Sequence, residues 1–192
     1  MYEVEVKFSV ADRHTLEQKL RLLAGQFREP VEQVDLYFAH PSRDFARTDE
    51  ALRLRRVGPD VAITWKGPRL DTATKTRREI ELPLVGVAAS RPDGPPATLQ
   101  RWTELLEALG FRRVLEVAKQ RVSARVRWDG AEVDVALDRV GGLGEFVELE
   151  LQACEGEVQL AQARVLSLAR ELGCGTPEKR SYLEMLLASR KT

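Results

Sequence analysis

Apolar and polar residues alternate along several stretches of the chain with the period of two that is typical of β-strands. At the N-terminus, Tyr2, Val4, Val6 and Phe8 alternate with charged residues, which predicts a strand over residues 2–10. Similar stretches, rich in β-branched and aromatic residues, predict seven further strands. These strands cover residues 31–39, 51–57, 61–67, 74–84, 112–128, 131–140 and 144–153.

Other stretches have the spacing of amphipathic helices. The predicted helices cover residues 12–24, 98–109, 157–172 and 180–189. Asp12 has the position of an N-cap and Gly25 that of a helix stop. Polar, Pro-containing segments at 40–50 and 86–97 are interpreted as surface loops.

Short connections join many of the predicted strands and favour antiparallel neighbours. Asp129 and Gly130 form a hairpin-type turn sequence, and "GGLG" at 141–144 forms another. Eight strands with helices at the sides and at the end suit an α+β protein with a closed antiparallel β-barrel and helices packed outside. We expect one domain over residues 1–192, with C-terminal helices at about 157–189.

Each predicted strand has an apolar face and a second face, because successive side chains point to opposite sides. Apart from strand 31–39, the second faces are largely charged. Their residues are Glu3, Glu5, Lys7, Arg53, Arg55, Ala62, Thr64, Lys66, Lys75, Arg77, Glu79, Glu81, Lys119, Arg121, Ser123, Arg125, Glu132, Asp134, Ala136, Asp138, Phe146, Glu148, Glu150 and Gln152.

Two arrangements of these charged faces are conceivable. An ordinary half-buried sheet exposes its polar face to water. However, the amphipathic helices 12–24 and 98–109 need an apolar surface to pack on, which would turn the charged faces inward. Buried charge is too costly unless it is paired or binds a ligand. We therefore favour a water-filled tunnel in which acidic and basic groups face each other.

The overall composition excludes some classes of function. The 30 Lys and Arg residues balance the 30 Asp and Glu residues, so no net field attracts nucleic acid or an anionic membrane. No apolar run approaches the roughly 20 residues of a membrane span, and the charged N-terminus does not resemble a signal peptide, so we expect a cytoplasmic protein. Cys154 and Cys174 lack the spacing of a disulfide framework or a zinc site and are interpreted as packing thiols.

The charged faces have the chemistry of a site for a metal-bound polyphosphate. Clustered carboxylates without His or Cys are hard ligands that suit Mg²⁺ or Mn²⁺. Clustered Arg and Lys suit phosphate oxygens. The chain has no G-x-x-x-x-G-K-[ST] loop, and His14 and His40 are isolated from any nucleophile, so other routes to phosphate or acyl chemistry find no support.

The segment "EVEVK" at 3–7 resembles the E-x-E-x-K signature of the CYTH superfamily, also called triphosphate tunnel metalloenzymes. The likeness continues, in order, through "DLYF", "ALRLRR", "ITWKGP", "RREIE", "VAKQR", "VDVALDRVGGLGEFVELE" and "KRSYLEML". It therefore covers nearly the whole chain. The segments "GLGEFVELE" and "SYLEML" are most similar to the class IV adenylyl cyclase branch.

The resemblance implies an eight-stranded tunnel that holds a triphosphate and a divalent metal ion, Mg²⁺ or Mn²⁺. By position it implies that Glu5, Lys7 and Glu148 are catalytic. The implied metal-site residues are Glu3, Glu5, Glu148 and Glu150, with Glu81 and Asp138 as helpers. The implied phosphate-binding residues are Lys7, Arg53, Arg55, Lys66, Arg77, Lys119 and Arg121. Glu79 is expected to hold neighbouring arginine side chains.

Two reactions remain open at this stage, because they differ only in which phosphorus lies in line with the attacking oxygen. The first is cyclisation of ATP to cyclic AMP and pyrophosphate, which the branch likeness favours. The second is hydrolysis of tripolyphosphate, a nucleoside triphosphate or thiamine triphosphate. A non-catalytic polyphosphate-binding module fits less well, because binding an anion would not need the carboxylates. A lipocalin-like carrier would need an apolar interior. A homodimer is compatible with the sequence.

Overall fold

The eight predicted strands are present in the computed structural model, which describes residues 2–24, 27–70, 74–84 and 94–190. The strands are β1 (Tyr2–Ser9), β2 (Val31–Ala39), β3 (Ala51–Val57), β4 (Asp60–Arg69), β5 (Arg77–Pro83), β6 (Arg112–Trp128), β7 (Ala131–Val140) and β8 (Gly144–Ala153). They form a closed antiparallel barrel in the order β1-β5-β4-β3-β2-β6-β7-β8, with helices packed outside, which confirms the predicted α+β fold class.

The helices of the described chain follow the predicted order, with one addition. They are α1 (Arg13–Ala24), α2 (Phe45–Thr48), α3 (Gly94–Ala108), α4 (Val158–Leu172) and α5 (Tyr182–Ser189), and a 3₁₀ turn at Glu155–Glu157 precedes α4. As predicted, Asp12 accepts a hydrogen bond at the start of α1, from the backbone N–H of Thr15 at 3.1 Å. No helix in the described ranges is long and apolar enough to cross a membrane.

The chain divides into two compact units, which are described separately below. The first unit consists of Met1–Pro30, Arg69–Arg77 and Lys119–Thr192, and the second of Val31–Pro68 and Arg78–Ala118. Strand β6 contributes residues to both units, since the division falls between Ala118 and Lys119.

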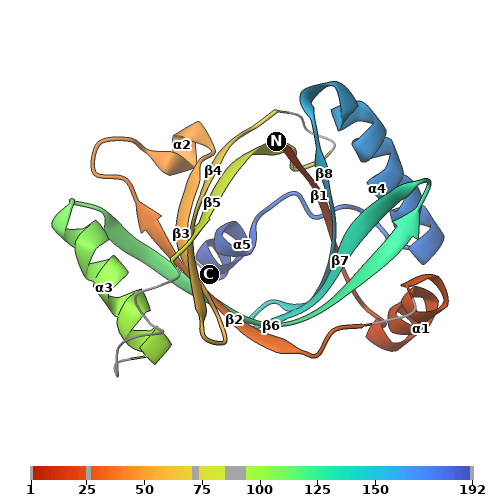
Figure 1. The fold of residues 1–192 in the computed structure, drawn as a ribbon, viewed down its shortest axis with the longest axis horizontal. Helices are drawn as coiled ribbons and strands as arrows, with labels where there is room; N and C mark the ends of the chain where they lie inside the picture. Colours follow the sequence, from red (N-terminus) through yellow and green to blue (C-terminus); the bar gives the residue numbers. More distant parts are fainter. Residues whose placement is uncertain (1, 25–26, 71–73, 85–93, 191–192) are drawn as a thin grey trace. The chain divides into compact units, whose positions relative to one another are not determined.

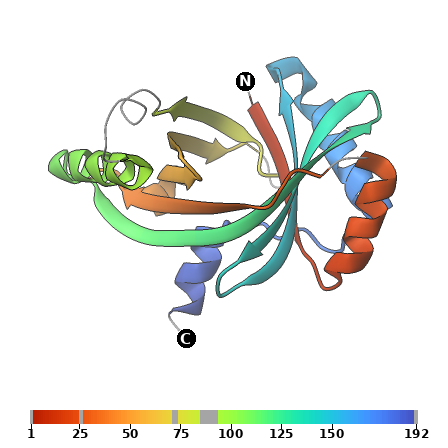
Figure 2. The same cartoon turned by 60° about the horizontal axis from the view of Figure 1, so that its bottom comes forward.

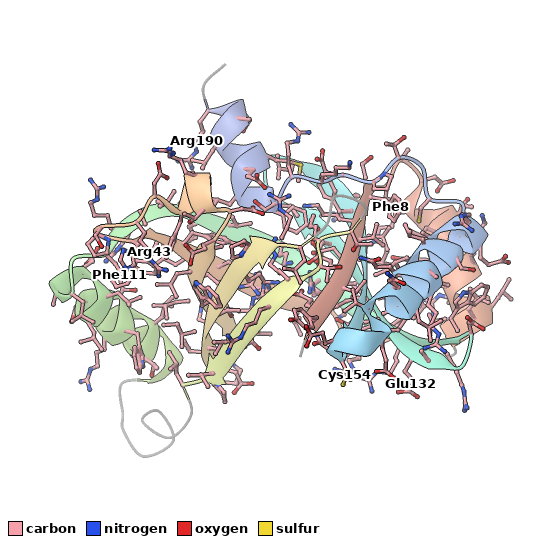
Figure 3. All side chains as sticks on the ribbon, turned by 90° about the horizontal axis from the view of Figure 1, so that it is seen from above. Phe8, Arg43, Phe111, Glu132, Cys154 and Arg190 are labelled. Atoms are coloured by element: carbon pink, nitrogen blue, oxygen red, sulfur yellow. The ribbon has the colours of Figure 1, made fainter. Side chains whose placement is uncertain are left out.

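The first unit has its hydrophobic core between helices and the apolar faces of β1, β7 and β8. Figures 1 and 2 show α1 and α4 on the same side of these strands. Val4, Val6 and Phe8 of β1 are buried in one cluster with Leu20 of α1 and Val165 of α4. Figure 3 labels Phe8, near the C-terminal end of β1. The amphipathic helices therefore cover the apolar side of the strands, as their pattern predicts.

A tight turn fixes the register between β6 and β7. Asp129 and Gly130 both have positive φ angles, 47° and 77°, as the two central residues of a type I′ hairpin turn require. The turn pairs Trp128 with Ala131, and this register continues to the pair Lys119 and Val140. One continuous ladder thus determines which β6 side chains lie beside those of β7.

The second unit has its own core beneath α2 and α3. Leu36, Phe38, Leu52 and Leu54 from β2 and β3 form a cluster with Leu106 of α3. The ring of Phe111, labelled in Figure 3, meets the ring of His40 edge-on at 5.1 Å between centroids. The second faces of β2 and β3 are therefore on the side away from this core.

Four sequence predictions need correction. The segment 40–50 contains the short helix α2, which Asp44 caps by accepting hydrogen bonds from two backbone N–H groups. Helix α3 begins at Gly94 rather than at 98, because proline is tolerated in the first turn of a helix. Strand β5 begins at Arg77 rather than at 74. Strand β2 does carry a buried polar face, as shown below.

Other predictions concern the cysteines and the segments between elements. Cys154 is exposed, so interpreting it as a packing thiol is wrong. Cys174 packs against the core of the first unit, and burial raises the pKa of its thiol to about 11. The predicted stop at Gly25 and most of the predicted loop at 86–97 lie outside the described residues.

Candidate functional site

The second faces of four strands of the first unit, β1, β6, β7 and β8, form one charged surface. The antiparallel registers place charged residues directly beside one another across neighbouring strands. The cross-strand partners are Lys7 with Glu148, Glu5 with Glu150, Asp134 with Glu150, and Arg121 with Asp138. The split of each strand into two faces, made from the sequence, is confirmed for this unit.

Much of this charged surface is buried. The exposed fractions are 4% for Glu3, 1% for Lys7, 6% for Lys119 and 0% for Asp138. A solvated outer strand face would leave such side chains largely accessible. The alternative that these residues line a wet outer face is therefore excluded, and each buried charge needs a partner or a ligand.

Glu148 is the carboxylate around which the cations of this unit gather. It forms a short ion pair with Arg121, and Nζ of Lys119 lies 4.0 Å from its Oε2. Burial alone would raise the pKa of Glu148, but the positive charges of Lys119, Arg121 and Lys7 outweigh that effect and hold the pKa well below its usual range. Glu148 is consequently ionised at any physiological pH.

Asp138 holds the cationic side chains of β6 in place. It accepts hydrogen bonds from Lys119 Nζ at 2.8 Å and from Arg121 Nε at 2.7 Å. The hydroxyl of Tyr182, at the start of α5, also donates to Asp138, at 3.0 Å. Burial and the nearby carboxylates raise the pKa of Tyr182 well above its usual value, so the hydroxyl keeps its proton. In this arrangement Asp138 positions cations.

Lys7 is a buried cation with no hydrogen-bond acceptor for its Nζ among the described residues. Its nearest groups include the rings of Tyr182 and Phe146, with Nζ 3.9 Å and 5.8 Å from the two centroids. Burial and the charge of Lys75 lower the pKa of Lys7 to about 7. A buried ammonium group that contacts ring faces and lacks an acceptor has the chemistry of a binding site for an anion.

Lys75 and Arg77 extend the cationic set of the first unit. Lys75 precedes β5 and donates from Nζ to Glu5 Oε1 at 2.9 Å. Burial would lower the pKa of Lys75, but Glu5 and Glu148 raise it above its usual value. Arg77 is buried at the first position of β5.

The carboxylates of β1 and β8 have the chemistry of a divalent metal site. Glu5 lies directly opposite Glu150, and like charges in such a pair repel each other unless a cation lies between them. Oxygen ligands without nitrogen or sulfur suit Mg²⁺ or Mn²⁺. No three acidic, His or Cys side chains come together as a formed metal site within residues 2–24, 27–70, 74–84 and 94–190. The donors thus fit such an ion but are not gathered around a common centre.

A cavity of about 270 Å³ lies beside these carboxylates within the first unit. Charged and small side chains line it, and no aromatic ring is among them. The lining residues are Arg28, Arg121, Ser123, Ala124, Arg125, Asp134, Val135, Ala136, Glu148 and Glu150. The cavity is therefore suited to a charged, strongly hydrated ligand.

The second unit has a separate charged cluster centred on Asp35. Arg55 forms a bidentate pair with Asp35, with N···O distances of 2.7 and 2.8 Å, and Arg53 Nη1 lies 3.4 Å from the same carboxylate. Gln33 donates to Asp35 at 3.3 Å. Burial would lower the pKa of Arg53, but Asp35 raises it above its usual value. Asp35 is 2% exposed, so this is a fully desolvated network.

The strands β4 and β5 contribute the remaining charges of the second unit. Lys66 Nζ pairs with Glu79 at 2.7 Å, and Arg53 lies 4.0 Å from Glu79. The expectation that Glu79 holds neighbouring cations is confirmed. Glu81 accepts a hydrogen bond from Thr64 at 2.9 Å, and its predicted role as a helper of the metal stays a prediction.

Comparison with known proteins decides the family. The model of the CYTH domain matches residues 1–182. The chain belongs to the CYTH-domain family. Its predicted resemblance, which was drawn from "EVEVK" and the segments that follow, is thereby confirmed.

Similar proteins and structures come from several organisms. A Methanocaldococcus jannaschii protein named "Putative adenylate cyclase MJ0240" is 29% identical over 188 residues, which cover 96% of this chain and 98% of the relative. The structure of PH1819 from Pyrococcus horikoshii is 38% identical, with a TM-score of 0.82 and coverage of 98% and 99% of the two chains. HpAC1 from Hippeastrum, described as a putative adenylyl cyclase with a dominant triphosphatase activity, shares the fold at 18% identity, a TM-score of 0.59 and coverage of 97% and 96%.

Three polar residues of this CYTH domain belong to the clusters but were absent from the predicted site. The sequence does not predict Asp35 as a site residue, because apolar residues occur at both odd and even positions of β2 and neither face is clearly polar. The polar residues Gln33 and Asp35, two positions apart, indicate that they share one face of the strand. The sequence predicts that Lys75 lies on a charged strand face but indicates no role for it. Tyr182 stands outside the strands, and only its place in the "SYLEML" segment marked it.

Proposed function

We propose that this CYTH domain is a divalent-metal-dependent enzyme that acts on a triphosphate. The observation that carries the proposal is the buried ammonium group of Lys7, which has no acceptor among the described residues and lies close enough to Lys75 for the two charges to interact. Two further cations of the same unit, Lys119 and Arg121, gather with it at Glu148. A triphosphate supplies many phosphate oxygens that such a set of cations can bind. Triphosphate tunnel metalloenzymes of the CYTH type generally use divalent metal ions, which supports the metal dependence.

We assign roles to the residues as follows. Glu3, Glu5, Glu148 and Glu150 are the proposed residues of the Mg²⁺ or Mn²⁺ site, with Glu81 and Asp138 as helpers. At that site the metal would act as a Lewis acid on phosphate oxygens and lower the pKa of a bound hydroxyl or water. The proposed phosphate-binding residues are Lys7, Arg53, Arg55, Lys66, Arg77, Lys119 and Arg121. The carboxylates that pair with these cations hold the ammonium and guanidinium groups in position before a substrate binds.

The first proposed reaction is cyclisation of ATP. The 3′-oxygen of the ribose forms a bond to the α-phosphorus, the bond from the α-phosphorus to the oxygen that bridges to the β-phosphorus breaks, and pyrophosphate leaves with the electron pair. The proton of the 3′-hydroxyl goes to a base, for which Lys7 is the proposed residue, because a pKa of about 7 leaves part of its population uncharged at neutral pH. The likeness of "GLGEFVELE" and "SYLEML" to class IV adenylyl cyclases supports this reaction.

The second proposed reaction is hydrolysis at the terminal phosphorus of a triphosphate. The oxygen of a water molecule forms a bond to that phosphorus, the bond from the phosphorus to the bridging oxygen breaks, and the shortened chain leaves with the electron pair. The water loses a proton to the solvent, and the terminal phosphate is released as orthophosphate. A specific observation favours it, namely that the described residues that line the cavity beside the carboxylates include no aromatic side chain. A nucleobase is usually bound by stacking on such rings, whereas an inorganic triphosphate needs none. The activity described for HpAC1 is also that of a triphosphatase.

One incubation series separates these reactions. The protein is incubated with ATP and, separately, with tripolyphosphate, in Mg²⁺ and in Mn²⁺, and the products are identified by phosphorus NMR. Cyclic AMP with pyrophosphate supports the cyclase, and orthophosphate from either substrate supports the hydrolase. Absence of turnover in every combination contradicts both reactions and leaves the binding module.

A further inference from the structure

The segment that precedes β5 is fixed in place by polar contacts on both of its sides. The hydroxyl groups of Thr74 and Thr76 lie 2.6 Å apart, and Gln162 Nε2 of α4 donates to each of them at 3.2 Å. The backbone N–H of Lys75 donates to the carbonyl of Glu5 at 2.8 Å. The two threonines and Lys75 are all buried. A helix on the apolar side of β1 thus fixes a segment whose lysine belongs to the charged side.

This arrangement holds the ammonium group of Lys75 against a carboxylate of the proposed metal site. Lys75 Nζ lies 2.9 Å from Glu5 Oε1, and both side chains are largely buried, with exposed fractions of 7% and 13%. Burial makes an uncompensated charge on either residue expensive. Any other cation that takes Glu5 must therefore compete with Lys75, and the displaced ammonium group must find another anion.

We propose that Lys75 is a placeholder cation, which neutralises Glu5 in the metal-free protein and is released to bind a phosphate oxygen when the metal takes Glu5. The inference rests on the proposed function. It adds Lys75 to the residues of the site and couples the binding of the metal to the binding of the triphosphate. A phosphate oxygen is the available anion because Glu148 already has Arg121 and Lys119 as partners. Metal binding and triphosphate binding then favour each other through Lys75, and this coupling is reciprocal.

Gln162 is a positioning residue in this scheme. Its side-chain amide donates to the hydroxyl groups of Thr74 and Thr76 and carries no charge. Replacing it with leucine would loosen the segment without altering the charges of the site. The change should weaken the contact between Lys75 and Glu5. Its effect on metal binding should have the same sign as that of removing Lys75, but should be smaller.

The test measures Mn²⁺ binding by isothermal titration calorimetry in the absence of any triphosphate. Lys75→Met removes the competing cation, so we expect it to bind Mn²⁺ on the order of tenfold more tightly than the wild type, and Gln162→Leu a few-fold more tightly. Lys75→Arg keeps the charge and should stay near the wild type. Lys19→Met makes the same chemical change on α1, where Nζ donates to the Leu172 carbonyl, and should have no effect.

The second half of the test measures binding of a non-hydrolysable triphosphate at saturating Mn²⁺, the state in which the metal has taken Glu5 and Lys75 is free to bind phosphate. Here Lys75→Met should bind about tenfold more weakly than the wild type, because a phosphate ligand is lost. Unchanged or weaker Mn²⁺ binding by Lys75→Met would overturn the placeholder role, even if the wild type turns over triphosphates as proposed. Failure of all four variants and the wild type to bind either ligand would instead overturn the proposed function together with this inference.

Discussion

The charged clusters of the two units differ in how their cations are partnered. In the second unit, Arg55 is held in a bidentate pair by Asp35, and Lys66 is paired with Glu79 at 2.7 Å. In the first unit, Lys7 has no hydrogen-bond acceptor among the described residues, and the charge of Lys75 lowers its pKa further. Buried cations that donate to acidic partners form a network by themselves, whereas Lys7 has Glu148 and Glu5 as nearby charges but can take a hydrogen-bond acceptor from a bound anion.

This difference indicates that the units make unequal contributions to the proposed activity. A bidentate pair with a carboxylate fixes the direction of the arginine guanidinium group, so the second unit suits the holding of phosphate groups. The first unit combines Lys7 with opposed carboxylates, which suits the reacting phosphorus and the metal. Substitutions of the charged residues in the first unit should therefore lower turnover, alone or together with affinity, whereas those in the second unit should lower affinity alone.

The largest effect is expected for Glu148→Gln. The substitution removes the negative charge at the centre of the first cluster, which pairs with Arg121 and lies 4.0 Å from Lys119. We expect turnover of the triphosphate to fall on the order of 10³-fold while the fold persists, as measured by phosphorus NMR and by circular dichroism.

Glu132→Gln provides the matched control for that variant. Glu132, labelled in Figure 3, lies on the same face of β7 but is 65% exposed in its side chain and pairs only loosely with Arg125, at 3.6 Å. Turnover by this control should stay within about twofold of the wild type, since exposed ion pairs contribute little. Equal losses in both variants would contradict the special role of Glu148.

Lys7→Met should lower turnover on the order of 10²-fold and yet stabilise the protein at neutral pH. In the folded protein the pKa of Lys7 is about 7, below its ordinary value of 10.5. Between pH 7 and pH 10.5, Lys7 is therefore more often protonated in the unfolded chain than in the folded protein. Lys7 therefore destabilises the fold at and below pH 7, on the order of a few kcal/mol, and this penalty disappears as the pH rises toward 10.

Thermal unfolding at several pH values tests whether Lys7 destabilises the fold at neutral pH and ceases to do so at high pH. The melting temperature of Lys7→Met should exceed that of the wild type most at pH 7 and should approach it toward pH 10. A constant difference across this range would mean that the charge of Lys7 is not the cause.

A comparison of Lys119→Ala with Arg53→Ala tests the two units against each other. Each loses a charge-assisted contact worth about 1.5–3 kcal/mol, so tripolyphosphate affinity should fall roughly 10-fold to 100-fold in each variant. Turnover at saturation should fall in Lys119→Ala but stay close to the wild type in Arg53→Ala. Titration calorimetry with mono-, di- and triphosphate should show that the variants lose least affinity for the shortest phosphate chain. Equal affinity of the wild type for monophosphate and triphosphate would contradict the proposed triphosphate site.

The smallest effect is expected at Tyr182. Tyr182→Leu removes the ring beneath Lys7 and the donor to Asp138, and should raise KM roughly fivefold through misplaced cations. Tyr182→Phe keeps the ring and should recover most of that loss. If Tyr182→Phe is as impaired as Tyr182→Leu, the hydrogen bond to Asp138 is what matters and the ring contact is not.

The fold was largely predictable because strand alternation is a local property of the sequence. The bounds of β2, β3, β6, β7 and β8 agree with the predicted ranges. The short helix α2 was not predicted, because four residues give too little periodicity and its capping residue Asp44 lies in a segment rich in turn-forming residues. The early start of α3 was hidden by Gly94 and the prolines after it, which usually mark a loop.

The site was predictable where it depends on strand faces and less so where it depends on tertiary contacts. Lys7, Glu148 and Asp138 follow from alternation and register alone. The contact of Lys75 with Glu5 is formed by a residue outside any strand, and the contact of Tyr182 with Asp138 joins a helix to β7 across 44 positions of the chain. Such contacts arise from packing, which one-dimensional periodicity does not encode.

The most direct test of the central claim is a crystal structure with Mn²⁺ and a non-hydrolysable triphosphate, in which anomalous scattering locates the metal. We predict a Mn²⁺ peak at the carboxylates of Glu5 and of its β8 neighbours Glu148 and Glu150, with a phosphate oxygen on Nζ of Lys7. A Mn²⁺ peak away from these carboxylates, with Lys7 still lacking an anion, would contradict the assignment of the site.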